Sequence, residues 1–191
     1  NVFALEYKSY GYIQPEFSYF IDGKGKYNQS EDKSSVFGQG TFITYLHEDS
    51  SKITIRAIGR YDDKDNNRTY FDLQKFKYEY FLDDATLSIG NDIIFWGVNE
   101  SFHVVDIINQ SNIAENLAGT KKLGQPMLAL SLYEEIGDVS IYVMPYFRER
   151  IFPGNNGRPR YAAEIDKDSV TFESSEEEKR IDLAVRFSKV I

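Results

Sequence analysis

The chain of 191 residues has the length of one domain, and its 30 Asp and Glu outnumber its 22 Lys and Arg. The formal charge of -8, without clusters of Lys and Arg, argues against a nucleic-acid partner. With no cysteine and only two histidines, His47 and His103, the sequence offers neither a thiolate nor a His-rich metal site, and we expect no metal, no cofactor and no enzymatic activity.

Aromatic residues make up 15% of the chain, yet 27% of its residues are charged. No run approaches 18 consecutive apolar residues, so the sequence predicts no transmembrane helix. Asn1 begins strand-like sequence without a basic and apolar leader, which predicts that the chain as given carries no signal peptide.

Apolar residues recur at every second position in successive segments, the period of a β-strand with two different faces. Val139, Ile141 and Val143, for example, alternate with polar or amphipathic residues. Most of these segments are longer than the usual strand of about 5–6 residues and match the roughly 9–11 residues that a tilted strand needs to cross a bilayer. The pattern predicts eight strands, near residues 10–21, 37–48, 52–61, 69–82, 86–96, 127–135, 138–150 and 180–190.

Two of the predicted strands contain an irregularity. Pro15 lies in the middle of the first strand and would remove a ladder hydrogen bond, which predicts an edge strand or a bulge there. In the fourth strand, Asp72 and Gln74 fall on the apolar face while Leu73 falls on the polar face. We therefore expect a β-bulge near Gln74, or an upper end of the strand that stands above the membrane.

The tight turn at residues 83–84 fixes which residues of the two adjoining strands face each other. It places Tyr80 opposite Leu87 on one face and Lys75 opposite Asp92 on the other. Since paired residues share a face, the first pair predicts a lipid-facing side and the second predicts a charged pair in the lumen.

The turn at residues 136–137 allows the same test on the next hairpin. A turn made of these two residues places Leu132 opposite Ile141 and Leu130 opposite Val143, all of them apolar. The residues between them are mostly polar, so both faces stay consistent across the hairpin.

The connections between the predicted strands alternate in length. Short turns are expected near 49–51, 83–84 and 136–137, and long polar loops near 22–36, 62–68, 97–126 and 151–179. A meander of strands places all the long loops at one end, as in outer-membrane barrels with short periplasmic turns and long extracellular loops. The sequence therefore predicts an all-β fold, an antiparallel up-and-down transmembrane β-barrel with a periplasmic N-terminus.

The connection 97–126 has a weak helical period, with Asp106 or Asn109 available as a cap. We expect a short helix inside a loop that folds into the barrel and narrows it; the alternative is an ordinary surface loop with one helical turn. The apolar stripe consists of Val105, Ile108, Ile113 and Leu117.

The segment 90–100 reads Gly-Asn-Asp-Ile-Ile-Phe-Trp-Gly-Val-Asn-Glu and is followed by an Asp-x-x-Asn loop. In this order, these features resemble a recurring segment of porin-like outer-membrane barrels of Proteobacteria. The likeness covers about residues 86–150 and includes the entry into the next strand at 123–127. It implies a barrel in the bacterial outer membrane that passes small solutes. The motif residues are Trp96, Gly97, Glu100, Asp106 and Asn109.

Members of that family are usually longer, have more than eight strands and end on an aromatic residue, whereas this chain ends Lys189-Val190-Ile191. We therefore expect residues 1–191 to be the N-terminal portion of a larger barrel. A single eight-stranded barrel domain is the alternative.

Charged residues recur on the polar face of the predicted strands. In a lumen they would set a field that orients a polar solute. The alternative is that the arginines only neutralise buried carboxylates such as Asp92 and Asp182 in a plugged barrel. The predicted pore-lining residues are Arg56, Arg60, Lys75, Asp92, Arg148 and Arg186.

Aromatic girdles mark the membrane interface in outer-membrane barrels. Tyr61, Phe95, Trp96 and Phe147 fall at similar heights on the predicted strands, so we expect them at the interface. For Trp96, the alternative is that it simply ends a strand.

Three functions follow from these patterns. The leading hypothesis is a porin-like channel of the bacterial outer membrane that passes small polar or anionic solutes by diffusion and contacts membrane lipid and lipopolysaccharide. The second is a soluble, secreted all-β ligand-binding module whose core is the face assigned above to lipid. The third is a closed eight-stranded outer-membrane barrel without a pore, packed with side chains.

Overall fold

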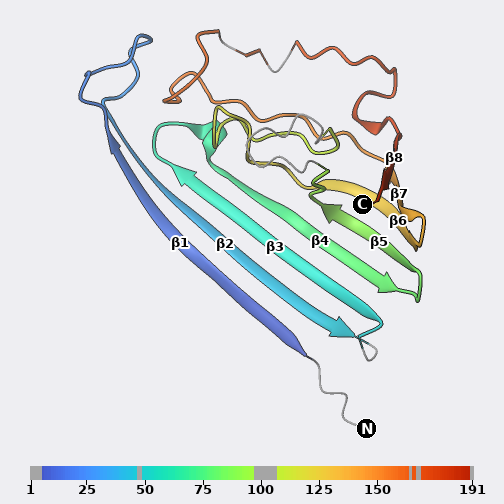
Figure 1. The fold of residues 1–191 in the computed structure, drawn as a ribbon. Helices are drawn as coiled ribbons and strands as arrows, with labels where there is room; N and C mark the ends of the chain where they lie inside the picture. Colours follow the sequence, from blue (N-terminus) through green and yellow to red (C-terminus); the bar gives the residue numbers. More distant parts are fainter. Residues whose placement is uncertain (1–5, 47–48, 97–106, 164, 167–168, 190–191) are drawn as a thin grey trace.

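A computed structural model describes residues 6–46, 49–96, 107–163, 165–166 and 169–189. These residues form one antiparallel sheet of eight strands in which neighbours in sequence are neighbours in space (Figure 1). The strands are β1 (Tyr7–Tyr19), β2 (Asp32–Leu46), β3 (Ser51–Asp62), β4 (Tyr70–Phe81), β5 (Ala85–Asp92), β6 (Gln125–Glu134), β7 (Gly137–Met144) and β8 (Asp182–Ser188). Two single 3-10 turns, η1 (Asn66–Arg68) and η2 (Glu177–Lys179), are the helical elements of the described residues.

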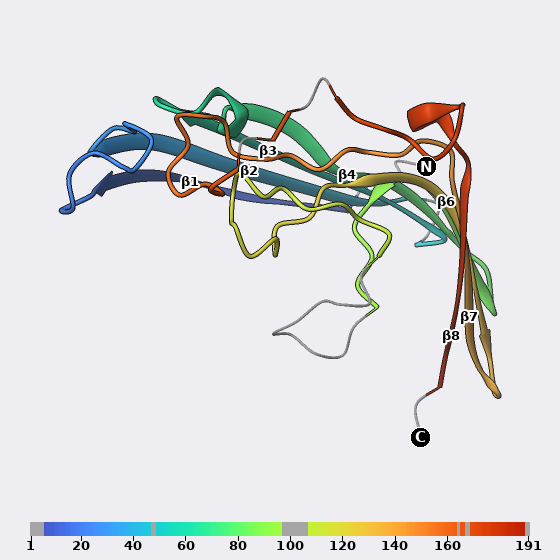
Figure 2. The same cartoon turned by 90° about the horizontal axis from the view of Figure 1, so that it is seen from above.

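The sheet is an up-and-down meander, and it is open. Within the described residues β1 pairs with β2 alone and β8 with β7 alone, so the two edges do not meet. Figure 2 shows that the sheet curls, because β6–β8 turn away from the plane of β1–β4. The all-β antiparallel fold is confirmed, whereas closure into a barrel is not a feature of this structure. None of the described helical segments is long and apolar enough to span a membrane.

The predicted sorting of connections by length is confirmed. The short connections β2–β3, β4–β5 and β6–β7 lie at one end of the sheet, and the long connections lie at the other (Figure 1). Each strand reverses the direction of the previous one, so alternate connections must fall at the same end.

Both predicted strand irregularities are present. Arg56 pairs with Lys75 and Ala57 pairs with Leu73, which leaves Gln74 as the extra residue of a β-bulge. Pro15 lies on β1, an edge strand of the described sheet. An edge strand has a neighbour on one side only, so the N–H that proline lacks cannot interrupt hydrogen bonds to a second neighbouring strand.

The hairpin between β4 and β5 has the predicted register, with Tyr80 opposite Leu87. The predicted register between β6 and β7 is wrong by two residues, since Leu132 pairs with Val139 and Leu130 with Ile141.

The cause of the shift is the position of the β6–β7 turn. Glu134 pairs with Gly137, so the two turn residues are Glu135 and Ile136. Gly137 has a φ of 138°, which a residue with a Cβ rarely adopts. A shift of two residues leaves every side chain on its predicted face.

Two strands end well before their predicted last residues, β5 at Asp92 instead of 96 and β7 at Met144 instead of 150. β5 ends at Asp92, whose own carboxylate accepts from Ile93 N–H at 2.8 Å, and Ile94 N–H donates to the Asn109 side chain at 2.8 Å. β7 ends at Met144 because Pro145 follows it and has no N–H to continue the ladder.

The short helix predicted within 97–126 is absent from its described part, residues 107–126. Backbone groups there bond across the loop and to the β7–β8 connection, without the repeated bonds to the preceding turn that a helix has. Asn112 N–H donates to Lys121 O, and Ile113 N–H donates to Ile151 O, both at 2.7 Å. The segment is therefore an irregular loop that is attached to the β7–β8 connection.

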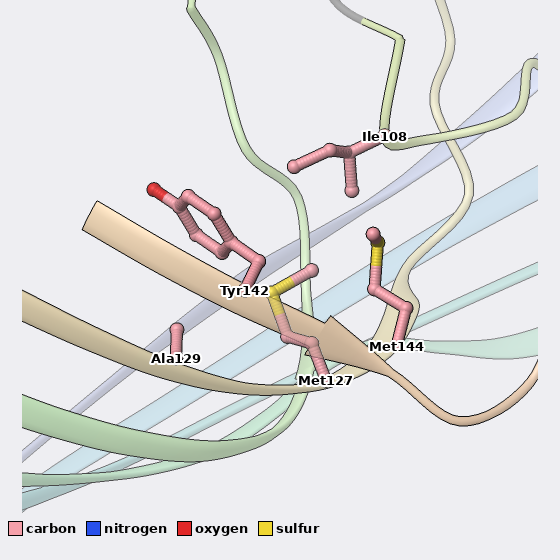
Figure 3. Packing of buried hydrophobic residues seen from close by; sticks show 5 residues of the cluster. All are labelled: Ile108, Met127, Ala129, Tyr142 and Met144. Carbon is pink, nitrogen blue, oxygen red and sulfur yellow. The ribbon is translucent and has the colours of Figure 1, made fainter. Parts of the chain in front are cut away.

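The two faces of the sheet differ in composition and in burial. The outer face is defined by large apolar side chains that remain exposed, for example Ile13 at 77%, Phe71 at 73% and Leu183 at 72%. The inner face carries charged and amide side chains, and loops cover its charged part on β3–β5, whereas the inner side of β1 stays exposed, with Tyr10 at 57%. Its apolar part is a buried cluster on β6 and β7 under the β5–β6 loop (Figure 3), which consists of Ile108, Met127, Ala129, Tyr142 and Met144.

Candidate functional site

Two groups of charged residues lie on the inner face. The first, the loop-end cluster, lies where the strands meet the long loops. Arg60 of β3 is its centre: its Nη1 lies 2.7 Å from Glu16 Oε2, and its Nε lies 2.6 Å from Glu115 Oε1. The Arg60 side chain is 5% exposed. The cluster consists of Glu16, Arg60, Asp62, Arg68 and Glu115.

The 3-10 turn η1 presents the second arginine of this cluster. Asp65 caps the turn by accepting from Asn67 N–H at 3.0 Å, and it also accepts from Gly154 N–H at 3.1 Å. Arg68 ends the turn, and its Nη1 lies 2.6 Å from Asp62 Oδ2. The loop-end cluster thus ties β1, β3 and the long loops together, with two arginines among three carboxylates.

The second group, the central cluster, lies on β3–β5 nearer to the short turns. The Asp92 carboxylate lies 2.6 Å from Lys75 Nζ and 2.7 Å from Lys77 Nζ, and the Glu79 carboxylate lies 2.9 Å from Lys77 Nζ and 2.7 Å from Lys52 Nζ. Four cations here face two carboxylates. The central cluster consists of Lys52, Arg56, Lys75, Lys77, Glu79 and Asp92.

Arg56 is the cation of the central cluster that has no carboxylate partner among the described residues. It lies opposite Thr41 on β2 and opposite Lys75 on β4. Its Nε is buried without a hydrogen-bond acceptor, and so is the Thr41 hydroxyl. The surplus of positive charge in this cluster is therefore centred on Arg56.

Four of the six predicted pore-lining residues come together in these clusters: Arg56, Arg60, Lys75 and Asp92. The predicted Lys75–Asp92 pair is present. Lys75 and Asp72 are three residues apart and would lie on opposite faces of a regular strand. The extra residue Gln74 brings both of them to the inner face.

The other two predicted pore-lining residues lie elsewhere. Arg148 follows the end of β7, where its Nη1 donates to Gly124 O at 2.7 Å and its Nη2 lies 3.1 Å from Asp72 Oδ1. Arg186 lies on β8 opposite Ser140 and has no ion pair with a described residue. Asp182, considered above as a partner for these arginines, pairs instead with Arg180 at 2.9 Å.

Sequence reasoning missed several members of the clusters. Lys77 and Glu79 share the inner parity of Lys75 and could have been found by that signal. Glu16 has the corresponding parity on β1, next to Pro15. Glu115 comes from an irregular loop, and no local pattern marks it as a partner of Arg60.

The predicted interface aromatics occupy different environments. Tyr61 and Phe95 are exposed at 63% and 57%, and their role at a membrane interface stays a prediction. Trp96 packs against the inner-face apolar cluster, with its ring 5.8 Å from that of Tyr142. Phe147 is half-buried, and its N–H donates to Glu178 O at 2.7 Å. The position of Trp96 favours packing over a girdle.

One residue of the family-like motif has a clear structural role. Asn109 is 3% exposed, accepts from Ile94 N–H and donates to Asp92 O at 2.8 Å and to Leu123 O at 2.9 Å. It thereby joins the end of β5 to the segment that enters β6. Three further motif residues, Gly97, Glu100 and Asp106, lie outside the described residues.

The β3–β4 connection is anchored by a carboxylate. Burial alone would raise the pKa of Asp63. The carboxylate accepts a hydrogen bond from Ser34 N–H at 2.8 Å and lies 3.1 Å from Lys64 Nζ, and these two interactions outweigh burial and lower the pKa. The ionised form of Asp63 therefore holds this connection to the start of β2.

A cavity of about 380 Å³ adjoins the loop-end cluster, between the inner face of β1–β4 and the β5–β6 loop. Its wall includes Tyr12, Phe37 and Tyr70 from the strands and Asn112 and Leu123 from the loop. Among the described residues, no group of His, Asp and Glu is arranged to hold a metal ion.

Comparison of the chain with protein-family models, with curated proteins and with solved structures gave no match. The geometry of the two faces and of the two clusters is therefore the basis for a functional proposal.

Proposed function

We propose that this chain forms part of the wall of a porin-like β-barrel in the bacterial outer membrane, which passes small polar or anionic solutes. One observation carries the proposal: the apolar face of the sheet is exposed, and the charged face is covered. A protein that folds in water buries these faces the other way round.

The exposed apolar residues favour a lipid environment. Full burial of a Val, Leu, Ile or Phe side chain is worth about 1.5–3 kcal/mol relative to exposure. Ile13, Phe17, Leu183, Val185 and Phe187 are all more than half exposed on the outer face. Contact with lipid acyl chains would recover this free energy over the entire face.

The covered inner face argues against the closed eight-stranded alternative. An eight-stranded barrel has an interior just wide enough for its own side chains. Here the β5–β6 loop already occupies the inner face, since Ile108 packs on β6 and β7 and Glu115 reaches Arg60 on β3. We therefore propose that further strands widen the barrel.

The unpaired edges of the sheet support the same conclusion. In a bilayer every backbone N–H and C=O of β1 and β8 requires a partner, which an adjoining strand supplies. The soluble-module alternative fits less well, because it needs the outer face as its core, and that face is exposed over the described residues.

Within this barrel, the inner face would line the solute path, and the β5–β6 loop would narrow it. The central cluster contributes surplus positive charge to a low-dielectric interior, where nearby groups outweigh the net charge of the whole chain. The proposed partners are membrane lipid, lipopolysaccharide on the loop side, and small solutes.

Cysteine labelling tests the proposal, because the chain has no native cysteine. Ser175→Cys, in the exposed β7–β8 connection, should react with an impermeant maleimide on intact cells. The matched variant Glu135→Cys, in the exposed β6–β7 turn, should react only after the outer membrane is permeabilised. Equal labelling of both on intact cells, or a monodisperse folded protein without detergent, would contradict the proposal.

A further inference from the structure

The cavity next to the loop-end cluster has a wall that is partly aromatic and partly amide. The Tyr12 and Phe37 rings lie 5.8 Å apart with an interplanar angle of 44°, on adjacent strands β1 and β2. Both side chains belong to the cavity wall. Such faces pack well against the C–H groups of a flat, partly apolar ligand.

Amide side chains supply unused hydrogen-bonding capacity in the same cavity. Gln39 of β2 makes no side-chain hydrogen bond with another described residue. Asn112 is 2% exposed, and its Nδ2 is buried without an acceptor. A buried donor without a partner is costly, and a rotation of the Asn112 side chain that brought this donor to an acceptor on a ligand would remove that cost.

The two arginines of the cavity wall are paired with carboxylates. Arg60 is held between Glu16 and Glu115, so an anionic ligand would have to displace a carboxylate to reach it. On the loop side, Lys122 Nζ donates to Ser111 Oγ at 3.3 Å, and Lys121 is exposed. The buried part of the wall therefore offers a neutral ligand both donors and acceptors.

We propose that this cavity is a binding subsite for a neutral sugar, a monosaccharide or one ring of a larger saccharide. A sugar ring has an apolar C–H face for Tyr12 and Phe37 and hydroxyl groups for Gln39 and Asn112. Its role as a passing solute rests on the proposed function, but its binding can be measured independently.

Saturation-transfer NMR on the full-length protein in a sugar-free detergent tests the subsite, with glucose and glucuronate as probes. We expect signal transfer to the glucose ring protons, and binding at least about tenfold weaker in Tyr12→Ala and in Gln39→Ala. Gln110→Ala serves as the matched control, because this glutamine lies outside the cavity, on the same β5–β6 loop. All variants should keep the β-type circular dichroism of the parent.

Three outcomes would overturn the inference: no transfer to glucose, glucose binding unchanged in both cavity variants, or glucuronate bound about tenfold more tightly than glucose. Conductance in a planar bilayer separates this inference from the proposed function. Conductance without glucose binding rejects the sugar subsite alone, whereas glucose binding without conductance rejects the channel alone.

Discussion

The loop-end cluster and the central cluster are built on the same inner face, yet their charges are arranged for different tasks. In the loop-end cluster each arginine lies between two carboxylates, and two long connections meet there, because β3–β4 supplies Arg68 and β5–β6 supplies Glu115. In the central cluster two carboxylates serve four cations, and Arg56 has no carboxylate. Under the proposed function, the central cluster with its surplus of cations is therefore the part of the inner face that we expect to act on a solute.

The difference has an energetic consequence. A buried cation whose carboxylates are all in place stabilises a particular loop arrangement, and its removal leaves those carboxylates buried and unpaired. A cation without a carboxylate contributes little to folding but leaves its field available to a passing ion.

The largest effect should follow from removing Arg60. Arg60→Met leaves the buried Glu115 without a cation and Glu16 with Arg68 alone, so we expect a loss of about 3–5 kcal/mol in the free energy of unfolding. Urea-driven unfolding from lipid would measure it. Arg186→Met is the control, because Arg186 lies on the inner face without an ion pair among the described residues. A similar loss of stability in both variants would contradict the special role of the Arg60 ion pairs.

A second prediction checks that both clusters face a lumen. Leu130 and Ser131 are neighbours on β6 that point to opposite faces. Leu130→Arg places a charge against lipid and should cost roughly 2–4 kcal/mol near the bilayer midplane, whereas Ser131→Arg should cost far less. The reverse order in the same unfolding assay would mean that the faces are assigned backwards.

Ion selectivity should depend on the central cluster. Arg56→Glu changes its balance from four cations and two carboxylates to three of each, so we expect a preference for anions to disappear. The reversal potential under a salt gradient reports this preference. Arg180→Glu, in the partly exposed β7–β8 connection, should leave it unchanged. Unaltered selectivity of a folded Arg56→Glu channel would assign Arg56 a structural role.

The smallest effect concerns Asp63, which holds the β3–β4 connection to the start of β2. Asp63→Asn removes the charge that holds Ser34 N–H, at a cost of at most about 1 kcal/mol because solvent screens this carboxylate. The pKa of Asp63 lies below its ordinary value of 3.8 in the folded protein. The contribution of ionised Asp63 to the free energy of unfolding is therefore complete above its ordinary pKa. This contribution is lost as the pH falls through the lowered pKa of the folded protein.

Unfolding measured from neutral to acidic pH checks this sign. The difference between the parent and Asp63→Asn should shrink as the pH falls. Asp83→Asn, in the opposite turn and without a hydrogen bond among the described residues, should show no such difference. A gap that widens in acid would contradict the assigned role of Asp63.

Local pattern predicted much of the sheet. The period of two assigned each strand residue to a face, and breaks in that period located the bulge at Gln74 and the edge strand that contains Pro15. Because these features depend on residues a few positions apart, the sequence contains them directly. The same parity placed Lys75 next to Asp92.

What depended on distant segments could not be predicted. The β6–β7 register required the position of a turn glycine, and β5 ended where Asn109 bonds its backbone. Glu115 reaches Arg60 only because the β5–β6 loop folds onto β3 instead of forming a helix. The sequence by itself thus determined the strands, their faces and the polarity of the inner surface. The tertiary structure alone decided which charges neutralise one another, because loops carry no fixed period and their path is set by packing and by buried ion pairs.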